Sequence, residues 1–182
     1  PTFRFLESRL TVRGSFGLRF NNLRENRYST TRRTIGNIFL SAQPSQDFGL
    51  DVQYANYGMR SNPRNDTLRI DNITQSFSVS PRYAFPAFGG SSTALVSYAL
   101  QDYTDYNTIT GALSDNRSHS GTAMWTLFFP STLNLTTSLM YTEATTSVYT
   151  MSIAGLNETI GYAFFDSRLS TSVTLGYNIV RV

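Results

Sequence analysis

Apolar side chains occupy every second position in a stretch near the start of the chain, residues 10–20. In an extended strand these positions share one face: Leu10, Val12, Gly14, Phe16, Leu18 and Phe20. About eleven residues is the length with which a tilted strand crosses a bilayer, and it is roughly twice the usual length of a strand in a soluble protein. The alternation therefore predicts a strand long enough to cross a membrane.

The same period of two recurs along the rest of the chain, and it predicts nine long strands together with a shorter tenth one at residues 2–6. After the first, the expected long strands are residues 32–43, 48–55, 67–85, 94–101, 120–129, 133–142, 148–164 and 169–179. Two of them are irregular. In the strand at 32–43, Ile38 and Leu40 oppose Ile35 and Phe39, and in 148–164 the parity changes, which predicts a β-bulge near residues 155–158.

Composition supports an all-β chain of one domain. Its 182 residues contain no run of about eighteen apolar residues and no convincing helical stripe, while Ser, Thr, Asn, Tyr and Phe are frequent. The mean hydropathy of −0.23 is expected of a barrel in which every second residue faces water. We therefore expect an antiparallel, up-and-down, transmembrane β-barrel of about ten strands.

Connections of different length follow one another in a regular order. Long polar segments, at 21–31, 59–66 and 103–116, and a moderate one at 143–147 alternate with short turns at 44–47, 86–91, 130–132 and 165–168. Transmembrane barrels place short turns in the periplasm and longer loops outside the cell, whereas both ends of a soluble sandwich face the same solvent. The order therefore favours a membrane barrel over a soluble sandwich.

Aromatic residues concentrate at both predicted strand ends, as they do at the two interfaces of a membrane. At the short-turn ends lie Tyr83, Phe85, Phe88, Phe128, Phe129, Phe164 and Phe165. At the long-loop ends lie Tyr57, Tyr103, Tyr106, Tyr141 and Tyr149. Because aromatic residues are also common in strands generally, this pattern is a weaker indication than the order of connections.

One strand carries the pattern Asp66, Thr67, Leu68, Arg69 followed by Ser78, Val79, Ser80, Pro81, Arg82, Tyr83. With this pattern and the alternation, the chain resembles Gram-negative outer-membrane β-barrel proteins, especially the barrels of large proteins. The resemblance implies an outer-membrane location, and it implies no assigned chemistry. Such barrels usually end in an aromatic residue, whereas this chain ends at Val182 and begins at Pro1. We therefore expect a single domain over residues 1–182 that is either a ten-strand barrel or the barrel portion of a longer polypeptide, with a leader or upstream region removed.

Residues suited to catalysis or metal binding are few. The chain has no Cys and a single His, His119, which by parity shares a face with Trp125 and Leu127 while Ser118 and Ser120 point the other way. The sequence therefore predicts no catalytic residue, no cofactor and no enzymatic function. Three acidic residues near one predicted loop could bind calcium weakly, but they lack ordered ligand spacing, so we expect no metal site: Asp102, Asp105 and Asp115.

The face opposite the apolar one would line the barrel lumen, among many Ser, Thr, Gly and Asn residues. Its charged and amide candidates are Arg13, Arg19, Asp51, Gln53, Arg82 and Gln101. Two hypotheses follow for this lumen. It is either a narrow polar pore with a slight preference for anions, or a plugged interior in which Arg and Asp pair across strands, which we favour for about ten strands.

The sequence leads us to expect an integral outer-membrane β-barrel that serves as a structural anchor or subunit of a larger cell-envelope assembly. One alternative is a narrow, porin-like diffusion channel, and another is a soluble β-rich adhesin or surface fibre. The expected partners are outer-membrane lipid and other envelope proteins, with no nucleic acid. The net charge of +3 says little about partners.

Overall fold

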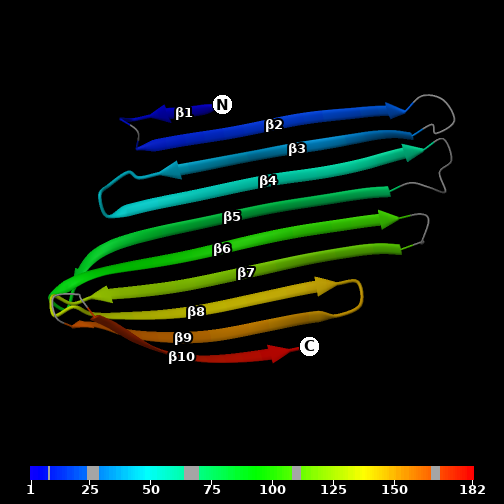
Figure 1. Cartoon of the computed structure of the whole chain (residues 1–182). Helices are drawn as coiled ribbons and strands as arrows, with labels where there is room; N and C mark the ends of the chain where they lie inside the picture. The colour runs from blue at the N-terminus through cyan, green and yellow to red at the C-terminus, as the bar shows by residue number, and fades with distance from the viewer. Residues whose placement is uncertain (8, 24–28, 64–69, 108–111, 165–168) are drawn as a thin grey trace.

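A computed structural model of the chain contains one antiparallel sheet of ten strands, in which the order in space follows the order in sequence, from β1 to β10 (Figure 1). The structure describes residues 1–7, 9–23, 29–63, 70–107, 112–164 and 169–182. Its strands are β1 (Thr2–Phe5), β2 (Leu10–Leu23), β3 (Ser29–Ala42), β4 (Phe48–Pro63), β5 (Ile70–Ala87), β6 (Gly90–Asn107), β7 (Ala112–Phe128), β8 (Leu133–Thr146), β9 (Thr150–Phe164) and β10 (Leu169–Arg181). The all-β, up-and-down arrangement and the short tenth strand at the N-terminus are confirmed.

Cross-strand pairing sorts the side chains into two faces, since partners in an antiparallel pair point to the same side. The face that contains Val12, which we call the apolar face, carries Phe16, Leu18, Ile38, Leu40, Val52, Tyr54, Phe77, Val79, Val96, Tyr98, Leu100, Leu127, Leu135, Leu139, Leu156, Ile160, Val173, Leu175, Tyr177 and Ile179. The opposite, polar face carries mostly Ser, Thr, Asn and Gln, among them Ser15, Asn37, Ser78, Ser97, Thr122, Ser138, Asn157, Thr174 and Asn178.

Register also resolves the two irregular strands. In β3, Ile38 and Leu40 lie on the apolar face, and Ile35 and Phe39 lie on the polar face. In β9 the predicted bulge is wrong, because β9 pairs with both neighbours in constant register over its whole length. The change of parity has a simpler cause: Ile153 is an apolar residue on the polar face, so the hydrophobic pattern shifts while the backbone does not.

At the end of the sheet where the long loops were expected, the strands are longer than the alternation predicts. Residues 59–63, 103–107, 112–116 and 143–146 are strand, not loop, and β4 to β7 each have 16 to 18 residues. Backbone pairing needs no apolar side chains, so the ladder extends past the point where the apolar pattern stops. Parts of the predicted loops, 24–28, 64–66 and 108–111, lie outside the described residues. Residues 67–69, the start of the strand predicted at 67–85 and part of the pattern that begins at Asp66, lie outside them as well.

Short connections lie at the other end, to the left in Figure 1. The expected turns at 44–47 and 130–132 lie between β3 and β4 and between β7 and β8, and 165–168 is outside the described residues. The turn expected at 86–91 is tighter, with only Phe88 and Gly89 between β5 and β6. Both have positive φ, 51° and 75°, as in the two-residue turns whose twist suits a hairpin. The connection 147–149, at the end of the sheet where longer loops were expected, is as brief as these turns. The two ends of the sheet therefore differ less in the length of their connections than the sequence predicts.

Among the residues that the structure describes, none forms a second layer over either face of the sheet. The accessible surface is 12903 Å², whereas a compact soluble protein of 20.4 kDa exposes about 8,800 Å². Among the described hydrophobic residues only Leu127 is buried, and Phe16 remains 72% exposed. No described helix is long and apolar enough to cross a membrane. The described pairing ends at β1 and β10 without joining them, so the sheet is open.

Four glycines of the polar face lie beneath side chains of the adjacent strand, and each of these side chains belongs to the glycine's direct partner. Arg82 lies over Gly49, Asn178 over Gly155, Asn134 over Gly161 and Asn157 over Gly176. A Cβ added at Gly176 would stand 2.6 Å from Asn157 Oδ1, and the other three positions are tighter still. The polar face is therefore crowded at these positions, and small residues there make room for long polar neighbours.

Candidate functional site

An apolar band crosses the middle of the sheet from one edge to the other. Its central row follows the register from β6 to β10 through Val96, Ala123, Leu139, Leu156 and Tyr177. Leu139 is 53% exposed and Tyr177 is 66% exposed, so these side chains present their apolar surface outward. Exposed apolar surface of this extent marks an interface with a membrane or another protein.

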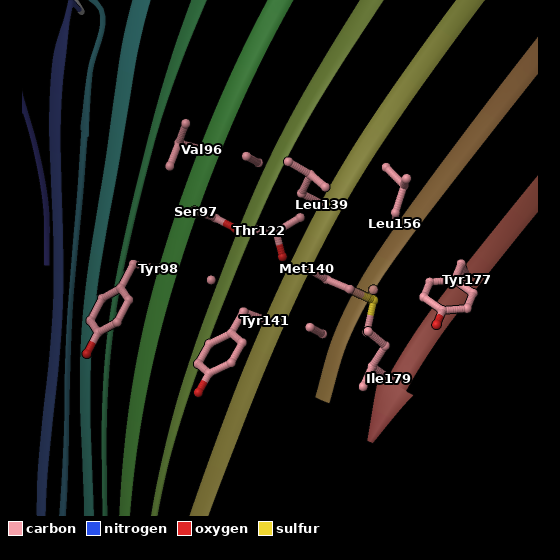
Figure 2. A pocket seen from close by; sticks show the side chains of 14 residues that line it. Val96, Ser97, Tyr98, Thr122, Leu139, Met140, Tyr141, Leu156, Tyr177 and Ile179 are labelled. Atoms are coloured by element: carbon pink, nitrogen blue, oxygen red, sulfur yellow. The ribbon is translucent and has the colours of Figure 1, made fainter. Parts of the chain in front are cut away.

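The band contains a shallow apolar hollow of about 560 Å³ between β6 and β10 (Figure 2). Small residues form its floor, because Gly121 and Ala154 pair with Tyr141 on either side of β8. Tyr98 and Tyr141 border it toward one end of the strands, and Leu139 and Leu156 lie across it. The hollow is lined almost entirely by apolar atoms, so an apolar group of a partner could fit into it, but few side chains there could form hydrogen bonds with that partner.

Glu158 is a charged residue within the apolar band. It lies on the apolar face between Thr137 of β8 and Leu175 of β10. Its Oε2 accepts a hydrogen bond of 2.7 Å from the Thr137 hydroxyl. This bond satisfies one carboxylate oxygen locally, and charged groups at such positions are uncommon because they lose hydration.

Aromatic pairs form the border of the band toward the short turns. Four pairs of rings are in contact there: Phe3 and Phe5 at 6.4 Å, Tyr83 and Phe85 at 5.6 Å, Phe88 and Trp125 at 6.5 Å, and Tyr162 and Phe164 at 4.5 Å. The Trp125 indole also donates a hydrogen bond to Ser92 Oγ, so it combines an apolar body with a satisfied polar group. The short-turn end thus carries an aromatic border spread from β1 to β9.

Charged residues form the opposite border of the apolar face, at the strand ends away from the short turns. Arg60 Nε lies 3.3 Å from Asp71 Oδ1, and Arg117 donates two hydrogen bonds to Asp102, at 2.6 and 3.2 Å. The hydrogen bond from Arg117 lowers the pKa of Asp102, and the same bond raises the pKa of Arg117. Both pairs join direct cross-strand partners, so they help to hold the extended strands together beyond the apolar band.

Tyrosines mark the change from apolar band to charged border. The Tyr98 hydroxyl and His119 Nδ1 are 2.6 Å apart, and the Tyr141 hydroxyl donates to Glu143 Oε2 at 2.7 Å. Each ring thus lies on the band while its hydroxyl reaches a polar partner. Two tyrosines expected in this border do not belong to it, because Tyr57 and Tyr103 lie on the polar face.

The six residues predicted to line a lumen all lie on the polar face: Arg13, Arg19, Asp51, Gln53, Arg82 and Gln101. The structure does not bring them together as a cluster. The described ion pairs, Arg60–Asp71 and Arg117–Asp102, lie on the other face, so the predicted pairing of Arg and Asp across strands occurs outside the expected lumen. Arg82 instead extends across Gly49.

The positions weighed for catalysis or metal binding are also dispersed. His119 lies on the apolar face and Ser118 and Ser120 on the polar face, as parity predicts. Asp105 lies on the polar face, whereas Asp102 and Asp115 lie on the apolar face, where Asp115 accepts a hydrogen bond from Thr104. The described residues contain no group of three His, Asp or Glu side chains that could hold a metal ion.

Sequence reasoning found the two faces but missed the covered glycines and the paired charges. Each depends on which residue of the next strand stands opposite, and a shift of register by two residues would separate every pair while preserving the faces.

Comparison of the chain with known protein families, with curated proteins and with solved structures found no match.

Proposed function

We propose that this chain is an integral outer-membrane β-barrel protein that acts as a structural anchor or subunit of a larger cell-envelope assembly. The observation that carries the proposal is the uncovered apolar band, which crosses all the long strands between an aromatic border and a charged border. Once the sheet closes, every strand has two neighbours and its backbone groups are paired. A bilayer can then cover the apolar band without contact with unpaired backbone groups.

Closure would place the polar face inside the barrel. The crowding on that face supports this direction of curvature, since side chains on the concave side of a sheet approach one another. At Gly49, Gly155, Gly161 and Gly176 a Cβ would collide with a partner's side chain, whereas at the four mid-strand glycines of the apolar face it would meet nothing closer than 3.6 Å. Two glycines depart from this contrast: Gly17 of the polar face is open, and Gly90, next to the β5–β6 turn, lies against the Phe128 backbone. An interior that is polar and an exterior that is apolar are what a membrane barrel requires.

The topology of the proposed barrel can be tested with single cysteines, because the native chain has none. We expect Val148→Cys, in the β8–β9 connection, to react with a membrane-impermeant maleimide on intact Gram-negative cells. Ser131→Cys and Gln46→Cys, in the opposite turns, should react only after the outer membrane is permeabilised. Labelled protein is measured by a mass shift on a gel.

Equal labelling at both ends on intact cells would contradict the proposal, and it would favour the soluble adhesin or fibre, whose two ends share one solvent. A lack of labelling at all three sites, before permeabilisation, would place the chain inside the cell and contradict it as well. Boiled and unboiled samples provide the control for folding, because a folded membrane barrel migrates differently on a gel before and after boiling.

A narrow diffusion channel is the second candidate, and the polar face is the observation that favours it. We rank it below the anchor because side chains laid across neighbouring strands, such as Arg82 over Gly49, take up space within the small lumen of about ten strands. Planar-bilayer recordings of the folded chain are expected to show no steps. Steps with anion preference that weakens in Arg13→Glu would overturn this ranking and identify an open cationic lumen.

A further inference from the structure

Three glycines form a diagonal row on the apolar face, one on each of β2, β3 and β4. Gly14 pairs with Ile38, two residues from Gly36, and Gly36 pairs with Asn56, two residues from Gly58. Each step thus moves one strand across and two residues toward the charged border. A Cβ added at any of the three would meet nothing closer than 3.6 Å, so the row is an open groove, unlike the covered glycines of the polar face.

The groove joins two hollows of different character. An apolar hollow of about 420 Å³ is lined by Gly14, Phe16, Gly36, Ile38 and Tyr54. A smaller, more polar hollow of about 230 Å³ is lined by Arg32, Gly58, Arg60 and Gln75. Thr34 and Asn56 line both, so the two hollows are adjacent. With strands about 4.8 Å apart and a rise of about 3.3 Å per residue, the glycine row spans roughly 16 Å.

Two arginines line the polar end of this groove, and their side chains turn toward opposite neighbouring strands, Arg32 toward β2 and Arg60 toward β5. Arg32 and Arg60 are direct cross-strand partners, and like charges in that position repel. Arg60 reaches Asp71 through Nε at 3.3 Å, while the Arg32 guanidinium lies 5.7 Å from the centre of the Phe20 ring. Among the described residues of this group, Asp71 offsets one of the two positive charges. Because both side chains line the same hollow, an anion with several oxygens that binds there would attract both guanidiniums toward it.

We propose that this groove binds one membrane lipid through an anionic phosphate group, with phosphatidylglycerol as the probe. Its phosphate would bind Arg32 and Arg60, with the side chains of Thr34, Asn56 and Gln75 nearby to donate hydrogen bonds, and one acyl chain would follow Gly58, Gly36 and Gly14 into the apolar band. The orientation suits a bilayer, because the charged end lies at the border and the apolar end points toward the middle of the band. This inference rests on the proposed membrane location of the apolar face.

The test uses the full chain in nanodiscs of phosphatidylcholine that contain a minor share of phosphatidylglycerol. Native mass spectrometry counts the phosphatidylglycerol molecules that stay bound, and varying their share gives an apparent affinity. We expect one retained molecule, and we expect Arg32→Gln with Arg60→Gln to weaken its retention about tenfold or more, as the loss of charge-assisted hydrogen bonds would. Gly36→Leu keeps both charges but blocks the groove, and it should weaken retention as well.

Arg19→Gln with Arg33→Gln is the matched control. Arg19 and Arg33 also oppose each other, on the polar face of β2 and β3, so their removal changes net charge equally but leaves the groove intact. An equal loss in this control, or unchanged retention in Gly36→Leu, would overturn the proposal. Displacement of the lipid by inorganic phosphate would also overturn it, because a simple ion site would then explain the arginines.

Failure of this inference can be told apart from failure of the proposed function. A chain that does not insert into phosphatidylcholine alone, as judged by its migration before and after boiling, contradicts the membrane barrel. A chain that inserts and retains phosphatidylglycerol no better than phosphatidylcholine contradicts only the lipid site. The same migration assay confirms that each variant has folded before its lipid is counted.

Discussion

Leu139→Arg should lower the free energy of unfolding of the chain in phospholipid vesicles by about 2–4 kcal/mol. Leu139 lies in the central row of the apolar band and points outward, so the substitution would place a charge where the proposal puts lipid. The cost arises because the guanidinium loses its hydration near the middle of the bilayer. Denaturant titration of the vesicle-bound protein, followed by the fluorescence of Trp125, measures the change.

Ser138→Arg is the control for this prediction. Ser138 is the preceding residue of β8 and lies on the polar face, so the same charge in the same strand should have a much milder effect. If the two variants lost equal stability, or if Leu139→Arg were neutral, the apolar face would not be the lipid-facing one. Because the two positions are neighbours in one strand, both variants place the charge at nearly the same distance from the strand ends.

Gly155→Val should destabilise the chain by about 1–3 kcal/mol through overpacking. Gly155 lies on the crowded polar face, where an added Cβ would collide with Asn178 Oδ1 and stand 2.8 Å from Met140 Cγ. Side chains from both neighbouring strands would have to move at once, although valine itself suits a strand better than glycine does. The same denaturant titration provides the measurement.

Gly17→Val is the matched control on the same face. No atom lies within 4 Å of a Cβ added at Gly17, so valine there should leave the stability unchanged or raise it slightly. A Gly155→Val variant as stable as Gly17→Val would show that the polar face is not crowded at β8 to β10. The polar face would then lack the crowding expected of the concave side of a sheet.

Alternation along the chain was sufficient to predict the class of fold. The faces assigned to Val12, Val79 and Leu139 from parity agree with the cross-strand register, and the short first strand was also found. Side chains in a strand alternate strictly, so a face that must avoid water leaves a period of two in the sequence. The same rule placed His119 apart from Ser118 and Ser120, and it grouped Arg13, Asp51 and Arg82 on one face.

Strand ends were harder to predict than strand faces. Residues 59–63 and 103–107 are polar, and their composition is that of a loop, yet they continue β4 and β6. What extends them is backbone pairing with the next strand, residues 59–61 with β5 and residues 103–107 with β7, and Arg60 opposite Asp71 adds an attraction that the segment does not show alone. The bulge predicted in β9 was wrong for a related reason, since Ile153 departs from the hydrophobic pattern without disturbing the ladder.

The sequence by itself determined that this chain forms long antiparallel strands with one apolar and one polar face, because that information is local and repeats every two residues. Tertiary structure alone decided which residues meet across strands: Arg32 with Arg60 at the end of an open groove, and Asn178 over Gly155 on the crowded face. Register sets those meetings, and register depends on the combined pairing of whole strands that are far apart in the chain. Each individual strand is compatible with several registers, and only the assembled sheet selects one.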